Sequence, residues 1–223
     1  MDEAALYIPC GEIELEGRLA EQPSQKAVVV THPHPLYGGD MDNPVVVSVI
    51  RAYAGMGYTT LRFNFRGVGR SHGMHGGGEG EQEDVAAALQ LLSEKGKTTI
   101  DLAGYSFGAW VIARGLPLYD AARRLIMVSP PVQFMDFSFL GRAPKLKLVV
   151  AGRRDDIGPS DRITGMLSRW NPESALRIIE GADHFFGGKT GELEAVIRSF
   201  LESDHETPDA RAYVKASCSS RKR

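Results

Sequence analysis

The 223-residue sequence contains only two cysteines, Cys10 and Cys218, which lie near opposite ends of the chain. Such low usage excludes a disulfide-stapled scaffold and favours a reducing compartment, where both residues are expected as free thiols. No apolar run reaches membrane-spanning length, and the acidic first residues do not resemble a secretory signal. We therefore expect a cytoplasmic protein without a membrane partner.

A strong charge of either sign is also missing. The formal net charge is -2 and no basic stripe is visible, which argues against nucleic acid as a partner because backbone phosphates require a concentrated basic surface. With 43% hydrophobic and 24% charged residues, the composition suits one soluble domain, which we place at residues 1–203. Residues 204–223 turn polar and lose any periodic pattern, which predicts a frayed tail.

Strand and helix patterns alternate along the chain. Residues 4–20 alternate loosely between apolar and polar side chains, which is typical of an antiparallel hairpin at a sheet edge. Strands and helices that alternate beyond the hairpin predict an α/β fold, with a mainly parallel, twisted sheet and helices on both faces. The expected strands are 27–31, 59–65, 99–103, 124–128, 146–150 and 175–179, and the expected helices are 44–54, 81–95, 109–113, 160–170 and 191–200.

The most informative stretch is Gly-Tyr-Ser-Phe-Gly at residues 104–108, between a predicted buried strand and a predicted helix. In G-x-S-x-G the two glycines let strand and helix approach closely, and the serine is held in a strained conformation with its hydroxyl exposed. A chance pentapeptide in a chain with 25 glycines would make Ser106 only a turn or cap residue. The strand-turn-helix context favours a nucleophile.

A serine hydroxyl becomes an effective nucleophile when a histidine removes its proton and a carboxylate orients that histidine. In an open parallel sheet both partners are expected after Ser106, at the ends of later strands. Asp155 is the candidate carboxylate and Asp156 is the alternative. In a purely structural interpretation, the two aspartates would only cap a loop. His184 is the candidate base, since it alone of six histidines occupies the position required by the order Ser, Asp, His. Asp183 is interpreted as a turn residue that faces away.

Acyl transfer also requires two hydrogen-bond donors for the oxyanion. The backbone N–H of Phe107, directly after the serine, is the first candidate. The second is expected from the loop after residues 27–31, where two prolines have no N–H to donate. His34 is the first choice in this loop, and Leu36 or Tyr37 is the alternative.

Other groups of histidine and glycine are weaker candidates. His32 and His34 at a strand end could bind zinc, but apolar and aromatic residues stand where further ligands would be needed, so no metal site is predicted. His72 and His75 are expected on a loop surface. The glycines at 76–78 lack the sequence of a phosphate-binding loop, and flexibility is the simpler interpretation.

Five motifs occur in a fixed order: His-Pro-His-Pro-x-x-Gly-Gly at 32–39, Asn-Phe-Arg-Gly-x-Gly-x-Ser at 64–71, the serine pentapeptide, Gly-x-x-Asp at 152–155 and Asp-His at 183–184. Together they resemble the α/β-hydrolase superfamily, and more narrowly its small lidless bacterial serine hydrolases, which are carboxylesterase-like and related to dienelactone hydrolases. The resemblance extends to about residue 201. It implies an α/β-hydrolase fold with no cofactor and no metal. Dienelactone hydrolase proper uses a cysteine nucleophile, so Ser106 favours ester or thioester hydrolysis over lactone opening.

The expected substrate is a small-molecule ester. Larger relatives insert a helical cap after the sixth strand, whereas residues 129–145 are too short for a cap domain. The aromatic residues of this segment, including Phe134, could line an acyl pocket or only pack in the core, and Leu36 and Tyr37 are further substrate-binding candidates. We expect an open, shallow site for small acyl groups. A peptidase, an acyltransferase or a non-catalytic binding protein of the same fold is the alternative.

Overall fold

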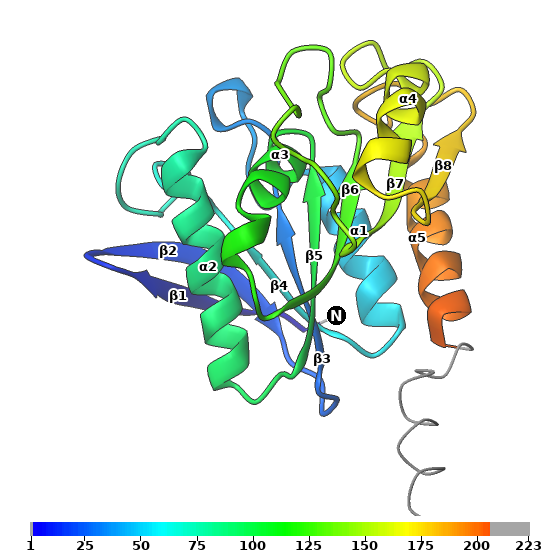
Figure 1. Ribbon diagram of the computed structural model, residues 1–223. Helices are drawn as coiled ribbons and strands as arrows, with labels where there is room; N and C mark the ends of the chain where they lie inside the picture. The colour runs from blue at the N-terminus through cyan, green and yellow to red at the C-terminus, as the bar shows by residue number, and fades with distance from the viewer. Residues whose placement is uncertain (1, 206–223) are drawn as a thin grey trace, which may run out of the picture.

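The computed structural model describes residues 2–205, which are built around one eight-stranded sheet (Figure 1). Its strands lie in the order β1-β2-β4-β3-β5-β6-β7-β8. The hairpin β1–β2 pairs antiparallel with β4, and all pairs from β4 to β8 are parallel, which confirms the predicted edge hairpin and mainly parallel sheet. The strands are β1 Ala4–Cys10, β2 Ile13–Ala20, β3 Lys26–Thr31, β4 Thr59–Phe63, β5 Thr99–Tyr105, β6 Ala122–Val128, β7 Leu146–Gly152 and β8 Ala175–Ile179.

Helices cover both faces of the sheet, as predicted (Figure 1). Helices α1 Pro44–Gly55 and α5 Thr190–His205 pack on one face, and helices α2 Glu79–Glu94, α3 Phe107–Arg114 and α4 Ser160–Trp170 pack on the other. Alternate side chains of β3 enter the two cores: Val28 faces α1 and α5, whereas Val29 faces the opposite layer. This is the pattern of a strand buried on both faces.

Several element ends differ from the sequence prediction. The strand expected at 59–65 ends at Phe63. Asn64 N–H still donates to the Glu16 carbonyl of β2, but Phe65 N–H leaves the sheet pairing and donates to the ring of His32. Residues 32–40, expected to be irregular, contain one short 3-10 helix, η1 (Pro35–Tyr37). Another, η2 (Leu116–Leu118), follows α3.

No helix interrupts residues 129–145 between β6 and β7, so the described chain carries no cap domain over the sheet. Helix α5 ends at His205, two residues into the tail predicted at 204–223, and the rest of that tail lies outside the described residues. Cys10 is a free thiol on β1, and Cys218 also lies outside them. Within residues 2–205 no helix has the length and apolarity to cross a membrane; the cytoplasmic location stays a prediction.

Candidate active site

Ser106 lies in the tight turn between β5 and α3. Its φ of 53° and ψ of -117° are strained for a residue with a side chain, as the motif predicts. A Cβ on Gly104 would lie 2.7 Å from the backbone nitrogen of Ala109, and one on Gly108 would lie 2.7 Å from the carbonyl oxygen of His32. Only glycine permits these approaches, which bring the backbones of β5, α3 and the end of β3 into contact.

The structure brings the side chains of Ser106, His184 and Asp155 into one hydrogen-bonded chain. His184 Nε2 lies 2.9 Å from Ser106 Oγ, and its Nδ1 lies 3.0 Å from each carboxylate oxygen of Asp155. Asp155 follows β7 and His184 follows β8, so the three groups meet at the carboxyl ends of the parallel strands. All three residues are at least nine-tenths buried. The arrangement can move the serine proton onto a carboxylate-oriented imidazole.

The two candidate acids, Asp155 and Asp156, have different surroundings in the loop after β7. Asp155 is buried, and its Oδ1 accepts the N–H groups of Ile157 and Gly158 at 2.9 Å and 2.7 Å. Burial by itself would raise the pKa of Asp155, but the hydrogen bond and charge of His184, with the Gly158 N–H, outweigh it and hold that pKa below its ordinary value. Asp155 is therefore the carboxylate that contacts His184, whereas Asp156 is exposed.

Tyr105 also holds His184, and the sequence reasoning did not identify it. Its hydroxyl donates a 3.0 Å hydrogen bond to the His184 carbonyl, which ties the loop after β8 to the end of β5. The available signal was its position next to Ser106 within the pentapeptide. Asp183 accepts the N–H of Phe185 at 3.0 Å, which is the turn role predicted for it.

The two residues that carry the candidate oxyanion donors pack against each other through their rings. The rings of His34 and Phe107 are 4.6 Å apart between centroids, and neither backbone N–H donates to another described residue. The alternatives are engaged: Leu36 N–H donates to His34 Nδ1 at 3.2 Å, and Tyr37 N–H donates to the His34 carbonyl at 3.1 Å. His34 is thus the remaining candidate of the three.

Leu36, Tyr37 and Phe134, the substrate-binding candidates, are exposed. They belong to a wider group of large apolar side chains that are exposed in the loops after β3, β4, β6 and β8, at the same edge of the sheet as Ser106. Exposed apolar side chains that gather in one place are typical of a binding surface. This apolar rim consists of Leu36, Tyr37, Met74, Phe134 and Phe185.

His32 has a structural position. Its Nδ1 donates to the Pro33 carbonyl at 2.6 Å, and its Nε2 accepts the N–H of Phe65 at 3.0 Å, so both ring nitrogens are occupied. Burial lowers its pKa to about 4. Within residues 2–205, no three His, Cys, Asp or Glu side chains are grouped so that they could hold a metal ion.

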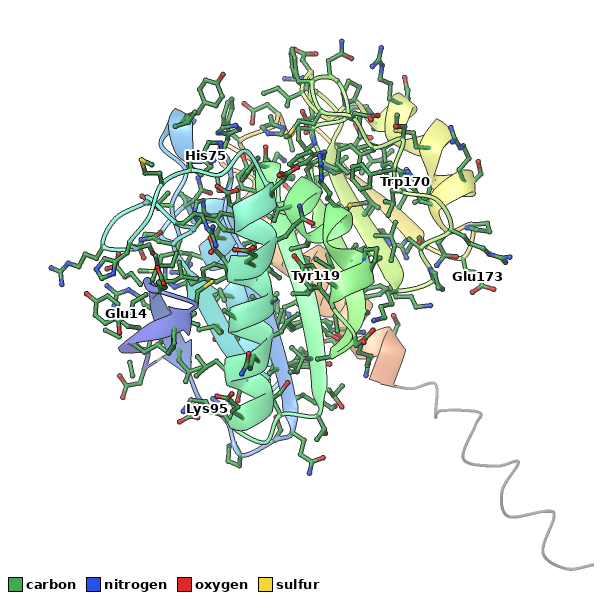
Figure 2. All side chains as sticks on the ribbon, turned by 60° about the vertical axis from the view of Figure 1, so that its left-hand side comes forward. Glu14, His75, Lys95, Tyr119, Trp170 and Glu173 are labelled. Atoms are coloured by element: carbon green, nitrogen blue, oxygen red, sulfur yellow. The ribbon has the colours of Figure 1, made fainter. Side chains whose placement is uncertain are left out.

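The expectation of a flexible glycine loop with two surface histidines is wrong for His75. Figure 2 shows His75 at the upper end of α2. His72 is exposed, but His75 is mostly covered, and its Nδ1 lies 2.7 Å from Oε1 of the buried Glu81. The same carboxylate accepts the N–H groups of Gly76 and Gly78 at 2.8 Å and 2.7 Å. The loop is therefore tied to the first turn of α2. A Glu three residues after the helix cap was the available signal.

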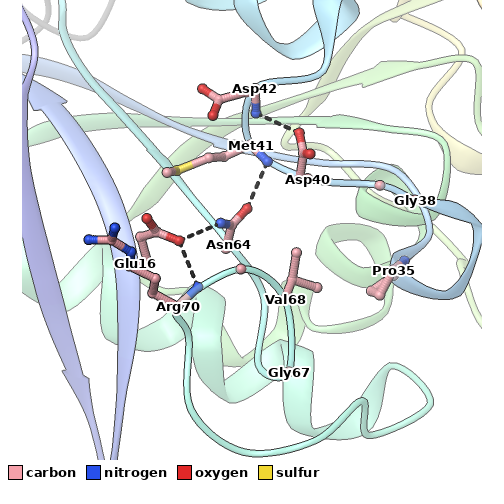
Figure 3. A pocket seen from close by; sticks show the side chains of 12 residues that line it. Glu16, Pro35, Gly38, Asp40, Met41, Asp42, Asn64, Gly67, Val68 and Arg70 are labelled. Carbon is pink, nitrogen blue, oxygen red and sulfur yellow. Dashed lines mark hydrogen bonds between the residues drawn. The ribbon is translucent and has the colours of Figure 1, made fainter.

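A separate cavity of about 490 Å³ lies beside the loop of residues 64–71 (Figure 3). The side chain of Asn64 spans it, accepting from Met41 N–H at 2.8 Å and donating to Glu16 at 2.9 Å. Neither Ser106 nor His184 lines this cavity. The motif at 64–71 thus braces neighbouring loops, and the cavity beside it does not include the serine and histidine of the candidate site.

The alpha/beta hydrolase family description matches residues 28–216. The chain is 36% identical over 208 residues to an uncharacterised protein of Rickettsia prowazekii, covering 88% of this chain and 87% of that one. It is also similar to the structure of an alpha-beta serine hydrolase homologue from Coxiella burnetii, with 32% identity, a TM-score of 0.83 and coverage of 90% and 98% of the two chains. It is similar as well to the structure of an α/β serine hydrolase without a lid from Xanthomonas campestris, with 29% identity, a TM-score of 0.84 and coverage of 94% and 98% of the two chains.

The glycine contact beneath Ser106 is testable by stability. Gly108→Ala should lower the free energy of unfolding by about 1 to 3 kcal/mol, because the added Cβ would overlap the backbone at the end of β3. Gly165→Ala in the exposed middle of α4 is the matched control, since a Cβ there meets nothing within 4 Å. In urea denaturation the free energy of unfolding of this control should rise by about 0.5 to 1 kcal/mol, because alanine is favoured over glycine inside a helix. Equal effects at both positions would contradict the close approach.

Proposed function

The chain belongs to the alpha/beta hydrolase family, and we propose that it is a serine hydrolase that cleaves carboxylic esters or thioesters of small acyl groups. The observation that carries the proposal is the hydrogen-bonded chain from Ser106 Oγ through His184 to Asp155. A hydroxyl, an imidazole and a carboxylate in this order form the arrangement that activates serine for acyl transfer.

In the proposed reaction Ser106 Oγ attacks the acyl carbon while its proton passes to His184 Nε2, 2.9 Å away. Asp155 keeps the Nδ1 proton in place and stabilises the imidazolium that forms. The tetrahedral intermediate collapses to an acyl-serine, and the leaving alcohol or thiol takes the proton from His184. Water then attacks the acyl-serine with His184 again as base, which releases the acid and restores the Ser106 hydroxyl.

The backbone N–H groups of Phe107 and His34 are the proposed donors to the oxyanion. Two observations support them: the two residues lie in ring contact, and neither N–H is used elsewhere in the described chain. Preorganised donors of this kind stabilise the charge that develops on the carbonyl oxygen.

A small-molecule ester is the proposed substrate class. No cap domain encloses the site within residues 2–205, and the apolar rim offers open contacts for the acyl or alcohol part through Leu36, Tyr37 and Phe134. A peptidase or an acyltransferase would use the same three side chains with another acceptor or leaving group. A non-catalytic binding protein would not require a serine, histidine and carboxylate in hydrogen-bond contact.

Labelling tests the nucleophile. A fluorophosphonate probe should attach to the wild-type protein and not to Ser106→Ala, and the variant should lose at least about a thousandfold in the hydrolysis of p-nitrophenyl acetate. Urea denaturation serves as the folding control. Absence of labelling in the wild type, or retained turnover in the variant, would sink the proposal.

The neighbouring aspartates provide a matched pair for the orienting acid. Asp155→Asn should lower kcat by about 10⁴-fold, because the amide no longer fixes the Nδ1–H tautomer of His184. Asp156→Asn alters an exposed side chain and should leave kcat unchanged. Steady-state kinetics on p-nitrophenyl acetate decide between them, and a larger loss at Asp156 would reverse the assignment.

Acyl-chain length tests the substrate class. The value of kcat/KM should be highest for p-nitrophenyl acetate or butyrate and fall for long chains, because the described chain has no cap to enclose a long acyl group. The same panel should include thioesters and amides. Long-chain esters that react far faster than acetate or butyrate would contradict the small-acyl proposal while leaving the serine mechanism intact.

A further inference from the structure

A second imidazole–carboxylate pair, His75 with Glu81, lies next to the proposed oxyanion site. Glu81 is fully buried, and its carboxylate is surrounded by His75 Nδ1 at 2.7 Å and by the N–H groups of Gly76 and Gly78. A buried carboxylate needs such partners to offset its desolvation. The pair is not part of the chain that runs from Ser106 through His184 to Asp155.

The ring of His75 lies against the rings of both residues whose N–H groups are the proposed oxyanion donors. Its centroid is 5.1 Å from the ring of His34 and 5.6 Å from that of Phe107, and those two rings are 4.6 Å apart. The three rings therefore form a mutually packed cluster. His34 comes from the loop after β3, Phe107 from the start of α3, and His75 from the loop after β4.

The glycine loop behind His75 is itself pressed onto α3. At Gly78, where φ is 93°, an added Cβ would overlap the ring of Trp110. The ring of Trp110 in turn lies 5.9 Å from that of Phe107. Both ends of the 75–78 turn are thus fixed, one by Glu81 and Trp110 and the other by the packing of His75 on the donor residues.

The His34 loop is held by bonds of its own: the N–H groups of Tyr37 and Gly39 both donate to the His34 carbonyl. Leu36 N–H donates to Nδ1 of His34, and this bond requires a neutral imidazole. Burial lowers the pKa of His34, and the neighbouring His75 lowers it further, against an opposing effect of Glu81. His75 thus supports the ring of His34 by packing and favours the neutral form that its loop needs.

We propose that His75, in contact with Glu81, is a positioning residue that holds the backbone donors of His34 and Phe107 in place for the oxyanion. This inference rests on the proposed serine hydrolase function. Backbone donors must stay within tenths of an ångström of their working positions, and misplacement by about 1 Å can cost about a hundredfold in rate. His75 acts through its neighbours and does not take part in proton transfer.

Substitution of His75 and Glu81 separates this role from a merely structural one. His75→Ala and Glu81→Gln should each lower kcat for p-nitrophenyl acetate by about tenfold to a hundredfold with KM unchanged, because the donors act most strongly on the transition state. Phosphonylation of Ser106 by a fluorophosphonate should slow by a similar factor, since the phosphoryl oxygen of the probe would accept hydrogen bonds from the same two donors.

His72→Ala is the matched control, since it removes an exposed imidazole from the same loop and should leave both rates unchanged. Urea denaturation identifies the folded variants, and Glu81→Gln keeps the test available where His75→Ala does not fold. Wild-type kcat in either folded variant, or a loss confined to KM or to the folded fraction, would overturn the positioning role.

The outcome also separates this inference from the proposed function. If the wild type is labelled and Ser106→Ala is inactive while folded His75→Ala turns over at the wild-type rate, only the positioning role fails. If the wild type is neither labelled nor active on esters, the serine hydrolase proposal fails and this inference fails with it.

Discussion

The contact of three backbones beneath Ser106 is the constraint on which the rest of the site depends. Gly104 and Gly108 bring β5, α3 and the end of β3 to distances that exclude any Cβ. Because α3 starts directly after the serine, the Phe107 N–H lies at its first turn with no helical acceptor. Because Gly108 touches the His32 carbonyl, the loop that carries His34 lies next to that N–H. One steric requirement thus brings together the serine and the two residues that carry the candidate donors.

Parallel strand ends supply the remaining groups. Asp155 and His184 follow the adjacent strands β7 and β8, and the Tyr105 hydroxyl joins the loop of His184 to the end of β5 across the sheet. The side chains therefore come from loops, but each lies within a few residues of the end of a strand. This explains how an edge without a cap domain can hold the three side chains at hydrogen-bond distances.

Periodicity predicted the sheet, its hairpin and its helices because burial on two faces leaves a plain pattern in strands such as β3. Finer choices depended on contacts between distant residues. Sequence favoured Asp155 over Asp156, but only its contact with His184 separates them structurally. The strand β4 ends early because His32, 33 positions before Phe65, takes that residue's N–H. His75 was misjudged because composition suggested a flexible loop, whereas one buried carboxylate, Glu81, contacts His75 and accepts two backbone N–H groups of that loop.

The histidines show why position alone does not define a base. His32 and His184 are both buried. In each ring Nδ1 donates a hydrogen bond to an oxygen and Nε2 accepts a hydrogen bond. The two histidines differ in the group that donates to Nε2. His32 accepts from the backbone amide of Phe65, which does not give up its proton, whereas His184 accepts from the hydroxyl of Ser106. Transfer from that hydroxyl creates a nucleophile, and Asp155 stabilises the resulting imidazolium; His32 has only the neutral carbonyl of Pro33 at the same position. The same imidazole tautomer therefore links the ends of β3 and β4 at His32 and provides the proposed base at His184.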